Sequence, residues 1–294
     1  MRVLLTGANG FLGYYLTGQL LEKGYETIAT GKGDCRLPYH SKNFFYHSMD
    51  FTDPFIVHDV FEKFRPEVVV HAGAMSKVDD CELRQWDAYR ANVEGTLTLL
   101  NNAEEKKSFF ILVSTDFIFD GRQGMYKEED APAPVNFYGK TKLEAEEAVK
   151  EYHFDWAIAR TILVYGKSHS SKDNILINVK NKLEKGEEYK VVNDQLRTPT
   201  YVEDLASGIV SIIAKRATGI YHLSGKDLLT PYQMACKAAG YLKLDSSLIK
   251  KVTADDFSQA ARRPLKTGFI IDKAKEKLGF EPISFEEGLQ KTFD

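Results

Sequence analysis

The chain has 294 residues, of which 43% are hydrophobic and 28% are charged, so it is too apolar for a disordered protein and too polar for a membrane protein. Its formal net charge of -3 is small for this length, so no overall electrostatic field attracts nucleic acid or an anionic membrane. Any anionic ligand must therefore be bound by local groups.

The three cysteines, Cys35, Cys81 and Cys236, lie far apart and form no C-x-x-C pair, which indicates a reducing compartment such as the cytoplasm. No apolar run approaches the roughly 20 residues that a membrane-spanning helix needs. The first residues lead directly into a strand-like segment and a glycine turn, so we expect no signal peptide.

Short apolar runs alternate with longer amphipathic stretches through the first half of the chain, which is typical of βαβ units in a parallel sheet. The predicted strands are 3–6, 26–30, 44–47, 68–72, 109–114 and 156–160. The predicted helices between them are 11–22, 54–64, 87–105 and 137–152. Right-handed crossovers would place helices on both sides of one sheet. The sequence therefore predicts an α/β fold with a doubly wound parallel sheet of the Rossmann type.

The pattern becomes looser beyond residue 160. Further predicted elements are a strand at 219–223 and helices at 175–185, 203–214, 231–239 and 273–278. No repeat or low-complexity linker occurs, so we expect two packed regions with a cleft between them. We assign residues 1–160 and about 196–222 to a dinucleotide-binding domain, and about 161–195 and 223–294 to a smaller C-terminal substrate-binding region.

Three glycines stand at G-x-x-G-x-x-G spacing in residues 6–13, TGANGFLG, between the first strand and the first helix. The first glycine can form a tight turn, the second lets backbone approach a pyrophosphate, and the third lets helix and strand pack closely. The helix N-terminus then offers free N–H groups to the anion. An ordinary strand-to-helix turn is the alternative. The pattern favours a dinucleotide site that includes Gly7, Asn9, Gly10, Phe11, Leu12 and Gly13.

The residues after the second strand bear on the choice of cofactor. NAD-binding proteins usually carry an acidic residue there for the ribose 2′-hydroxyl, but here Gly31 and Lys32 occupy the strand end. Lys32 could neutralise a 2′-phosphate, so we expect NADP(H) to be preferred. NAD(H) stays possible, because Asp34 could bind the ribose while Lys32 is solvated.

Two further strand ends are placed to meet the cofactor. Asp50 and Phe51 follow the third strand and are expected to border an adenine. Ala72, Gly73 and Ala74 follow the fourth strand, where small residues permit backbone contact with the cofactor. For both segments the alternative is a simple polar turn or tight loop.

Tyr138 and Lys142 are four positions apart on a predicted helix and therefore project from the same face. A ketone that receives hydride becomes an alkoxide and needs a proton, which a tyrosine can give if a nearby cation lowers its pKa. Lys142 would supply that cation and hold the cofactor ribose. Thr115, at the end of the fifth strand, would help to polarise the carbonyl. The spacing alone also arises by chance on surface helices.

Several linked motifs carry a resemblance to a known family. The segments 113–121 (VSTDFIFDG), 126–130 (YKEED) and 138–144 (YGKTKLE) resemble the dTDP-4-dehydrorhamnose reductases, a family of extended short-chain dehydrogenases. Residues 92–96 (NVEGT) are similar to the asparagine segment of the wider superfamily, which implies that Asn92 belongs to the cofactor site. Residues 199–206 (PTYVEDLA) and the Arg263-Pro264 turn also resemble family segments, so the likeness spans most of the chain.

The resemblance implies an NADPH-dependent reduction of the C4 ketone of dTDP-4-dehydrorhamnose to dTDP-rhamnose. Thr115, Tyr138 and Lys142 would be catalytic, and Thr115 and Asp116 would contact the sugar. Related dehydratases carry Asp-Glu after the threonine, whereas Phe117 follows Asp116 here and cannot transfer protons, which disfavours dehydration.

A nucleotide-sugar substrate brings its own pyrophosphate, so cations are expected in the substrate-binding region. Arg197, Arg262, Arg263 and Lys266 are candidates, although such side chains are often simply solvated. The histidines show no H-x-x-x-H spacing, so we expect no metal site. His71 lies in an apolar strand and is expected to be a core histidine.

Two alternatives to the reductase stay open. One is another nucleotide-sugar epimerase or oxidoreductase, which would recycle a tightly bound nicotinamide. The other is a non-catalytic regulatory subunit, because a family that resembles the reductases serves as partner of a methionine adenosyltransferase. A homodimer is compatible with either, and we expect neither nucleic acid nor membrane as a partner.

Overall fold

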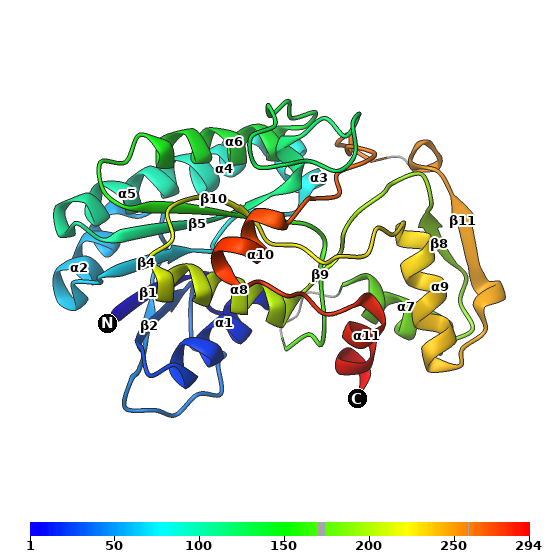
Figure 1. Cartoon of the computed structure of the whole chain (residues 1–294), viewed down its shortest axis with the longest axis horizontal. Helices are drawn as coiled ribbons and strands as arrows, with labels where there is room; N and C mark the ends of the chain where they lie inside the picture. The colour runs from blue at the N-terminus through cyan, green and yellow to red at the C-terminus, as the bar shows by residue number, and fades with distance from the viewer. Residues whose placement is uncertain (170–173, 258) are drawn as a thin grey trace.

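The computed structural model describes residues 1–169, 174–257 and 259–294 (Figure 1). Its largest sheet has seven strands: β1 (Arg2–Thr6), β2 (Glu26–Gly31), β3 (Phe44–Ser48), β4 (Val68–His71), β5 (Phe109–Thr115), β6 (Trp156–Thr161) and β10 (Gly219–His222). The sheet order is β10-β6-β5-β4-β1-β2-β3, and every pairing in it is parallel. All seven strands were predicted, and no strand end differs from its prediction by more than one residue.

Helices cover both faces of this sheet, which confirms the doubly wound α/β fold. On one face lie α1 (Phe11–Glu22), α8 (Val202–Lys215) and α10 (Asp272–Leu278), and on the other α2 (Pro54–Phe64), α5 (Gly95–Lys106) and α6 (Phe137–Lys150). Side chains along one strand alternate between the two covers. Val3 and Leu5 pack with the first group, whereas Leu4 packs with the second. This two-sided burial explains why the strands are apolar throughout.

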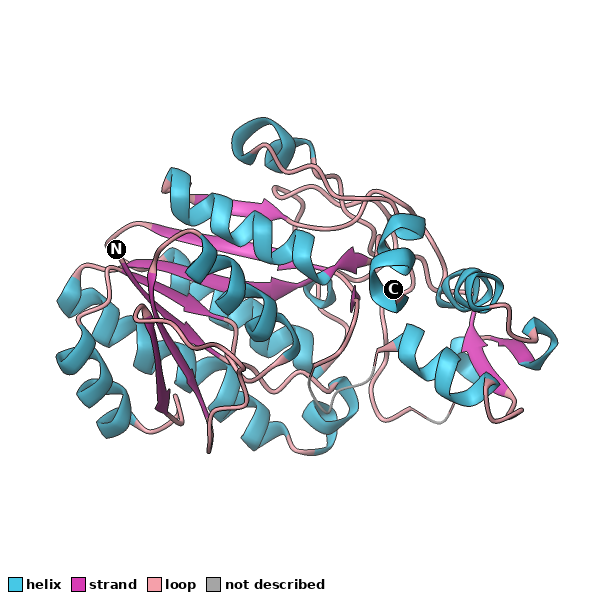
Figure 2. Cartoon of the chain, turned by 90° about the horizontal axis from the view of Figure 1, so that it is seen from below, coloured by secondary structure: helices cyan, strands magenta, loops and turns pink. Residues whose placement is uncertain are grey.

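A smaller unit with its own apolar core lies at one end of the molecule (Figure 2). It contains α7 (Ile175–Leu183), β8 (Tyr189–Val192), α9 (Pro231–Leu242), β11 (Ile249–Val252) and α11 (Phe285–Phe293). Strands β8 and β11 form a parallel pair of their own, and β7 (Val164–Tyr165) pairs with β9 (Thr200–Tyr201). Residues 170–173 of the predicted substrate-binding region lie outside the described residues.

The helix predicted over 87–105 is present but not uniform. The chain is helical without a break through α4 (Gln85–Tyr89), a wide π-helical turn at Arg90–Glu94 and α5, and the short α3 (Val78–Leu83) precedes them. A single π-helical turn inserts one residue into an otherwise α-helical run, and no residue of this segment marks that insertion in the sequence. The short elements α3, β7, β8, β9, β11 and α11 were also not predicted.

Candidate active site

Two adjoining cavities, of about 600 and 510 Å³, lie at the carboxyl ends of the parallel strands. Both are lined by Gly7, Gly10, Ala72 and Ala74, from the turns after β1 and β4. The first cavity continues along the turns after β2 and β3, and the second along β5, β6 and α6. The strand order reverses between β1 and β4, and ligands of doubly wound sheets bind at such a point.

The glycine turn packs backbone closely against backbone at Gly7 and Gly13. Gly7 has a φ of 72°, and a Cβ on it would lie 2.9 Å from the amide nitrogen of Gly73. A Cβ on Gly13 would lie 2.3 Å from the carbonyl oxygen of Gly7, so helix and strand are in direct contact there. Helix α1 begins after Gly10, whose position carries no side-chain cap, so first-turn amides can bind an anion. Phe11 and Leu12 line the second cavity.

Asn9 lines the first cavity and holds the loop after β2 in place. Its amide nitrogen donates to the carbonyl oxygen of Asp34 at 3.0 Å and to the Tyr46 hydroxyl at 2.8 Å. Its Oδ1 accepts the backbone amide of Arg36 at 3.0 Å. Asn9 therefore couples the glycine turn to the loop at 31–36.

Three cationic side chains line the first cavity: Lys32, Arg36 and Arg90. Lys32 forms an ion pair with Asp50 at 2.7 Å, so an incoming phosphate would share it with a carboxylate. Burial alone would raise the pKa of Asp50, but hydrogen bonds from Lys32 and Thr52 outweigh burial and lower that pKa. Sequence reasoning identified Lys32 and missed Arg36 and Arg90. Arg36 lies in the loop after β2 and Arg90 in the π-helical turn, and no sequence motif marks either position. The two adjoining cavities are together called the groove below.

Phe51 lines the first cavity and explains the glycine after β4. A Cβ on Gly73 would lie 2.5 Å from the Phe51 ring. The amide of Gly73 donates to the Thr6 hydroxyl at 3.1 Å, and that hydroxyl lies 2.7 Å from Nδ1 of His71. Burial, together with the charge of Lys142, lowers the pKa of His71 to about 3, so this histidine is a neutral core residue as expected.

Thr115, Tyr138 and Lys142 all line the second cavity. Thr115 ends β5, and the other two lie one turn apart on α6. Asn136 fixes the start of α6, because its Oδ1 accepts a first-turn amide at 2.8 Å. The Lys142 ammonium donates to the carbonyl oxygen of Val113 at 2.9 Å, which directs it along β5. The structure thus brings the three predicted catalytic residues together.

The protonation of these groups follows from burial. Burial raises the pKa of Tyr138, a hydrogen bond with Thr115 offsets part of this rise, and the nearby Asp116 carboxylate adds to it. Burial also lowers the pKa of Lys142 to about 8, against the opposing effect of Glu146. The lowering of the Tyr138 pKa that we expected from Lys142 is not found, because burial dominates and the Asp116 carboxylate adds to the rise. Tyr138 is therefore protonated at neutral pH and has a proton to give.

Among the described residues, the Ser114 hydroxyl is buried and has no hydrogen-bond partner. Ser114 lines the second cavity immediately before Thr115. A buried hydroxyl without a partner costs about 1–3 kcal/mol. A polar ligand in the second cavity could supply that partner, so the orphaned hydroxyl fits a site that is completed by a ligand.

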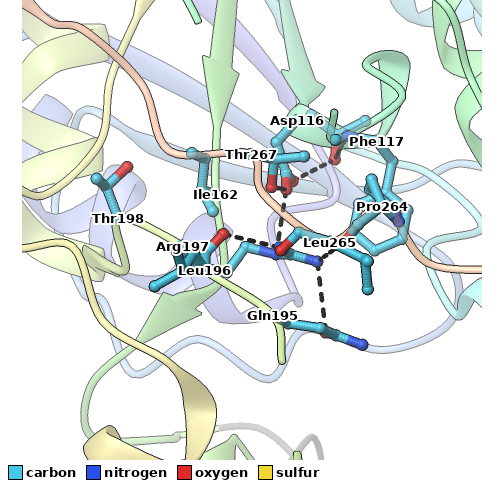
Figure 3. A network of polar contacts seen from close by, with 12 residues as sticks. Asp116, Phe117, Ile162, Gln195, Leu196, Arg197, Thr198, Pro264, Leu265 and Thr267 are labelled. Carbon is cyan, nitrogen blue, oxygen red and sulfur yellow. Dashed lines mark hydrogen bonds and ion pairs between the residues drawn. The ribbon is translucent and has the colours of Figure 1, made fainter. Parts of the chain in front are cut away.

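Arg197 was expected to bind a substrate anion, but it is 4% exposed and lines neither cavity. Its Nε lies 3.5 Å from Oδ2 of Asp116, and that oxygen also accepts the Thr267 hydroxyl (Figure 3). The other four N–H groups donate to the carbonyl oxygens of Leu196, Leu265 and Pro264 and to Oε1 of Gln195. All five donors of the guanidinium are therefore engaged, and we no longer assign Arg197 to the substrate.

Asp116 lines the second cavity, but both of its carboxylate oxygens are engaged. Oδ1 accepts the Thr115 hydroxyl at 3.2 Å, and Oδ2 faces Arg197 and Thr267. Burial raises the pKa of Asp116, and the Arg197 charge opposes that rise. Asp116 therefore ties the end of β5 to the segment at 195–198 and to the C-terminal segment that contains Thr267, rather than pointing free into the cavity.

Arg263 is also not free for a substrate. Its guanidinium forms two hydrogen bonds with the carboxylate of Asp79 on α3, at 3.0 and 2.6 Å, and a third with the carbonyl oxygen of Ala261. This pairing holds the pKa of Asp79 below its ordinary value. Arg263 thus joins the C-terminal segment to α3. Arg262 and Lys266 are exposed beside it.

Asn92 lies in the π-helical turn and lines neither cavity. Its Oδ1 accepts the amide of Met75, and its Nδ2 donates to the carbonyl oxygen of Met75 and to the Thr141 hydroxyl. Met75 does line the first cavity. Asn92 therefore supports the cavity wall through Met75. The sequence alone could not tell this supporting role from direct contact between Asn92 and a cofactor.

Within the described residues, three acidic or histidine side chains could share a metal ion: His58, Glu62 and Glu105. All three are exposed, and none lines either cavity. No helix in the described part of the chain is long and apolar enough to span a membrane. The three cysteines are free.

Comparison with known proteins identifies one family and two kinds of relative. A family described as RmlD substrate binding domain matches residues 1–294. The chain is 32% identical to methionine adenosyltransferase 2 subunit beta of Pongo abelii, over 99% of this chain and 86% of that protein. It is 30% identical to dTDP-4-dehydrorhamnose reductase of Aggregatibacter actinomycetemcomitans, over 98% of this chain and 97% of that protein.

A crystal structure of dTDP-4-dehydrorhamnose reductase from Bacillus anthracis in complex with NADP is also similar. It superimposes with a TM-score of 0.87 and 31% identity, and the match covers 99% of this chain and 98% of that one.

Proposed function

Since the chain belongs to the RmlD substrate binding domain family, we propose that it is an NADPH-dependent reductase of a nucleotide-linked deoxysugar. The ketone at C4 would be reduced, and dTDP-4-dehydrorhamnose, which would give dTDP-rhamnose, is the first substrate to test. The observation that carries the proposal is the shared cavity of Thr115, Tyr138 and Lys142, which adjoins the glycine turn.

The residues of the second cavity have distinct parts in this reaction. NADPH bound in the groove would supply a hydride to the C4 carbon. The Tyr138 hydroxyl would then give its proton to the C4 oxygen, which leaves a phenolate on Tyr138. The Lys142 ammonium and the Thr115 hydroxyl would stabilise that phenolate until it takes up a proton again. The Ser114 hydroxyl is available to a polar group of the ligand.

The first cavity supports NADP(H) in preference to NAD(H). Lys32 follows β2 directly and Arg36 lies in the loop after it, near where a 2′-phosphate would be bound, and no acidic residue occupies the strand end itself. Asp50 already neutralises Lys32 in part, so Arg36 becomes the main cation for that phosphate. NADP in the similar structure from Bacillus anthracis agrees with this choice.

We assign residues 1–160 and about 196–222 to cofactor binding. The remaining residues, about 161–195 and 223–294, would bind the sugar nucleotide. Arg262 and Lys266 are exposed candidates for its pyrophosphate. The carbonyl oxygen of Arg262 accepts the Asn136 amide at 2.7 Å, which places this segment at the start of the helix that carries Tyr138.

The test is NADPH oxidation with a panel of nucleotide-linked 4-keto sugars. We expect stoichiometric oxidation with at least one of them. Tyr138→Phe should abolish turnover and leave the NADPH dissociation constant within about twofold, because the phenol acts on the sugar oxygen. Turnover with nicotinamide that is not consumed would instead indicate an epimerase. Full turnover by Tyr138→Phe would refute the assigned proton donor.

A second candidate function is supported by the 32% identity with the methionine adenosyltransferase subunit over 99% of the chain. A subunit of that kind could keep the cofactor groove without turning over a sugar. It would form a stable complex with a methionine adenosyltransferase catalytic chain in size-exclusion chromatography. Complex formation without NADPH oxidation on the whole panel would favour the subunit over the reductase.

A further inference from the structure

A buried ion pair lies behind the second cavity. Glu146 on α6 is 0% exposed and Arg160 on β6 is 1% exposed, and neither lines either of the two cavities described above. Nε of Arg160 lies 3.0 and 3.2 Å from the two carboxylate oxygens, and Nη2 lies 2.7 Å from Oε2. Removing two charges from water is costly, and such a pair contributes little net stability. Its presence behind a candidate catalytic helix therefore suggests a purpose other than stability.

Arg160 has further contacts besides Glu146. Its Nη1 donates to the carbonyl oxygen of Glu128 at 3.2 Å, and its guanidinium lies 5.4 Å from the centre of the Phe119 ring. His222 lies 3.4 Å away, and burial together with the Arg160 charge keeps the pKa of His222 well below its ordinary value. This neutral histidine adds no charge beside the pair, and three contacts from the guanidinium hold the Glu146 carboxylate in place.

Glu146 is placed to act on Lys142. Residues 138, 142 and 146 are each separated by four positions, so they form one row along α6. Lys142 is 2% exposed, and its ammonium is bound to the carbonyl oxygen of Val113. Of the groups that face Lys142, Tyr138 on the same helix and His71 on β4 are both neutral near pH 7. Burial lowers the pKa of Lys142, and Glu146 is the negative group that opposes this lowering.

We propose that Glu146, held in place by Arg160, is a positioning residue that stabilises the ammonium group of Lys142 one turn away on α6. Glu146 does not touch the cavity and acts through Lys142. Arg160 fixes the position of the buried carboxylate, which would be costly to bury without a cationic partner. The inference deepens the proposed reductase function, in which Lys142 must be charged, but it can be tested without any sugar.

The direct test is the pH dependence of the acetylation of Lys142 by acetic anhydride. The folded protein is labelled first and then digested, and mass spectrometry of the peptides measures the acetylation of Lys142. Only the neutral amine reacts, so the rate reports the pKa of Lys142. In Glu146→Gln we expect this pKa to fall by about one pH unit, so that Lys142 reacts about tenfold faster at a pH below both values. The matched control is Glu147→Gln on the same helix, because Glu147 is exposed and pairs with Lys150. It should leave the rate unchanged.

A second variant covers the case in which Glu146→Gln does not fold, since Arg160 would then be a buried charge without its partner. Glu146→Gln/Arg160→Met removes both charges together, which such sites often tolerate. It should also lower the pKa of Lys142. An unchanged acetylation profile in whichever of the two variants folds would overturn the proposal.

Turnover provides an independent measurement. If the reductase function holds, the fall of kcat/KM at alkaline pH should begin about one pH unit lower in Glu146→Gln than in the unmodified protein. If no sugar is reduced, the proposed function fails, while the acetylation result still decides the role of Glu146.

Discussion

Replacing Arg197 with methionine should destabilise the protein severely. The substitution leaves the Asp116 carboxylate buried without its cation and removes the donor from the carbonyl oxygens of Leu196, Pro264 and Leu265. Removing one partner of a buried ion pair costs about 3–5 kcal/mol of stability, and this cost already includes part of the loss of hydrogen bonds. We expect a loss of about 4 kcal/mol, which is a large share of the roughly 5–15 kcal/mol that stabilises a typical domain.

Urea unfolding followed by tryptophan fluorescence measures this loss as a lower midpoint at unchanged slope. Arg262→Met is the matched control, because Arg262 is exposed on the adjoining segment and should change stability by no more than about 0.5 kcal/mol. Asp116→Asn/Arg197→Met should recover part of the loss, since no carboxylate is then left unpaired. A change below about 1 kcal/mol in Arg197→Met, combined with a raised KM for the sugar nucleotide, would show that Arg197 binds substrate after all.

Three other predictions concern the groove. Arg36→Ala should weaken NADPH binding about tenfold and leave NADH binding unchanged, which fluorescence titration of both nucleotides would measure; equal losses would remove Arg36 from the phosphate site. Gly13→Ala should abolish binding of both nucleotides, because its Cβ would lie 2.3 Å from the carbonyl oxygen of Gly7; tight binding by this variant would contradict the close packing of α1 on β1. The pKa of Lys142 is about 8 in the folded chain against an ordinary 10.5, so the unfolded state binds more protons between these values and Lys142 makes stability rise with pH there. Lys142→Met should remove that rise in urea titrations at pH 8 and pH 10, and an identical rise in both proteins would show that other groups cause it.

Local sequence patterns were enough to predict the strands of the main sheet and the residues at the centre of the candidate active site. The seven strands were predictable because two-sided burial makes each of them apolar throughout, and a glycine-rich turn after the first strand has few other uses. Tyr138 and Lys142 could be paired from spacing alone, because helix geometry places residues four apart on one face. Thr115 followed from its place at a strand end. These features depend on neighbours within a few residues.

The tertiary structure decided which charges are free and which are consumed. Arg197 and Arg263 looked like ligands in the sequence, but the first is saturated by carbonyl oxygens and Asp116, and the second by Asp79, which is 184 positions away. Arg36 carries no motif, yet it lines the groove. A buried guanidinium must satisfy its donors wherever the folded chain supplies acceptors, and those acceptors come from segments that local sequence does not connect. The same long-range pairing places Glu146 against Arg160, so the electrostatic support of Lys142 exists only once α6 has packed on β6.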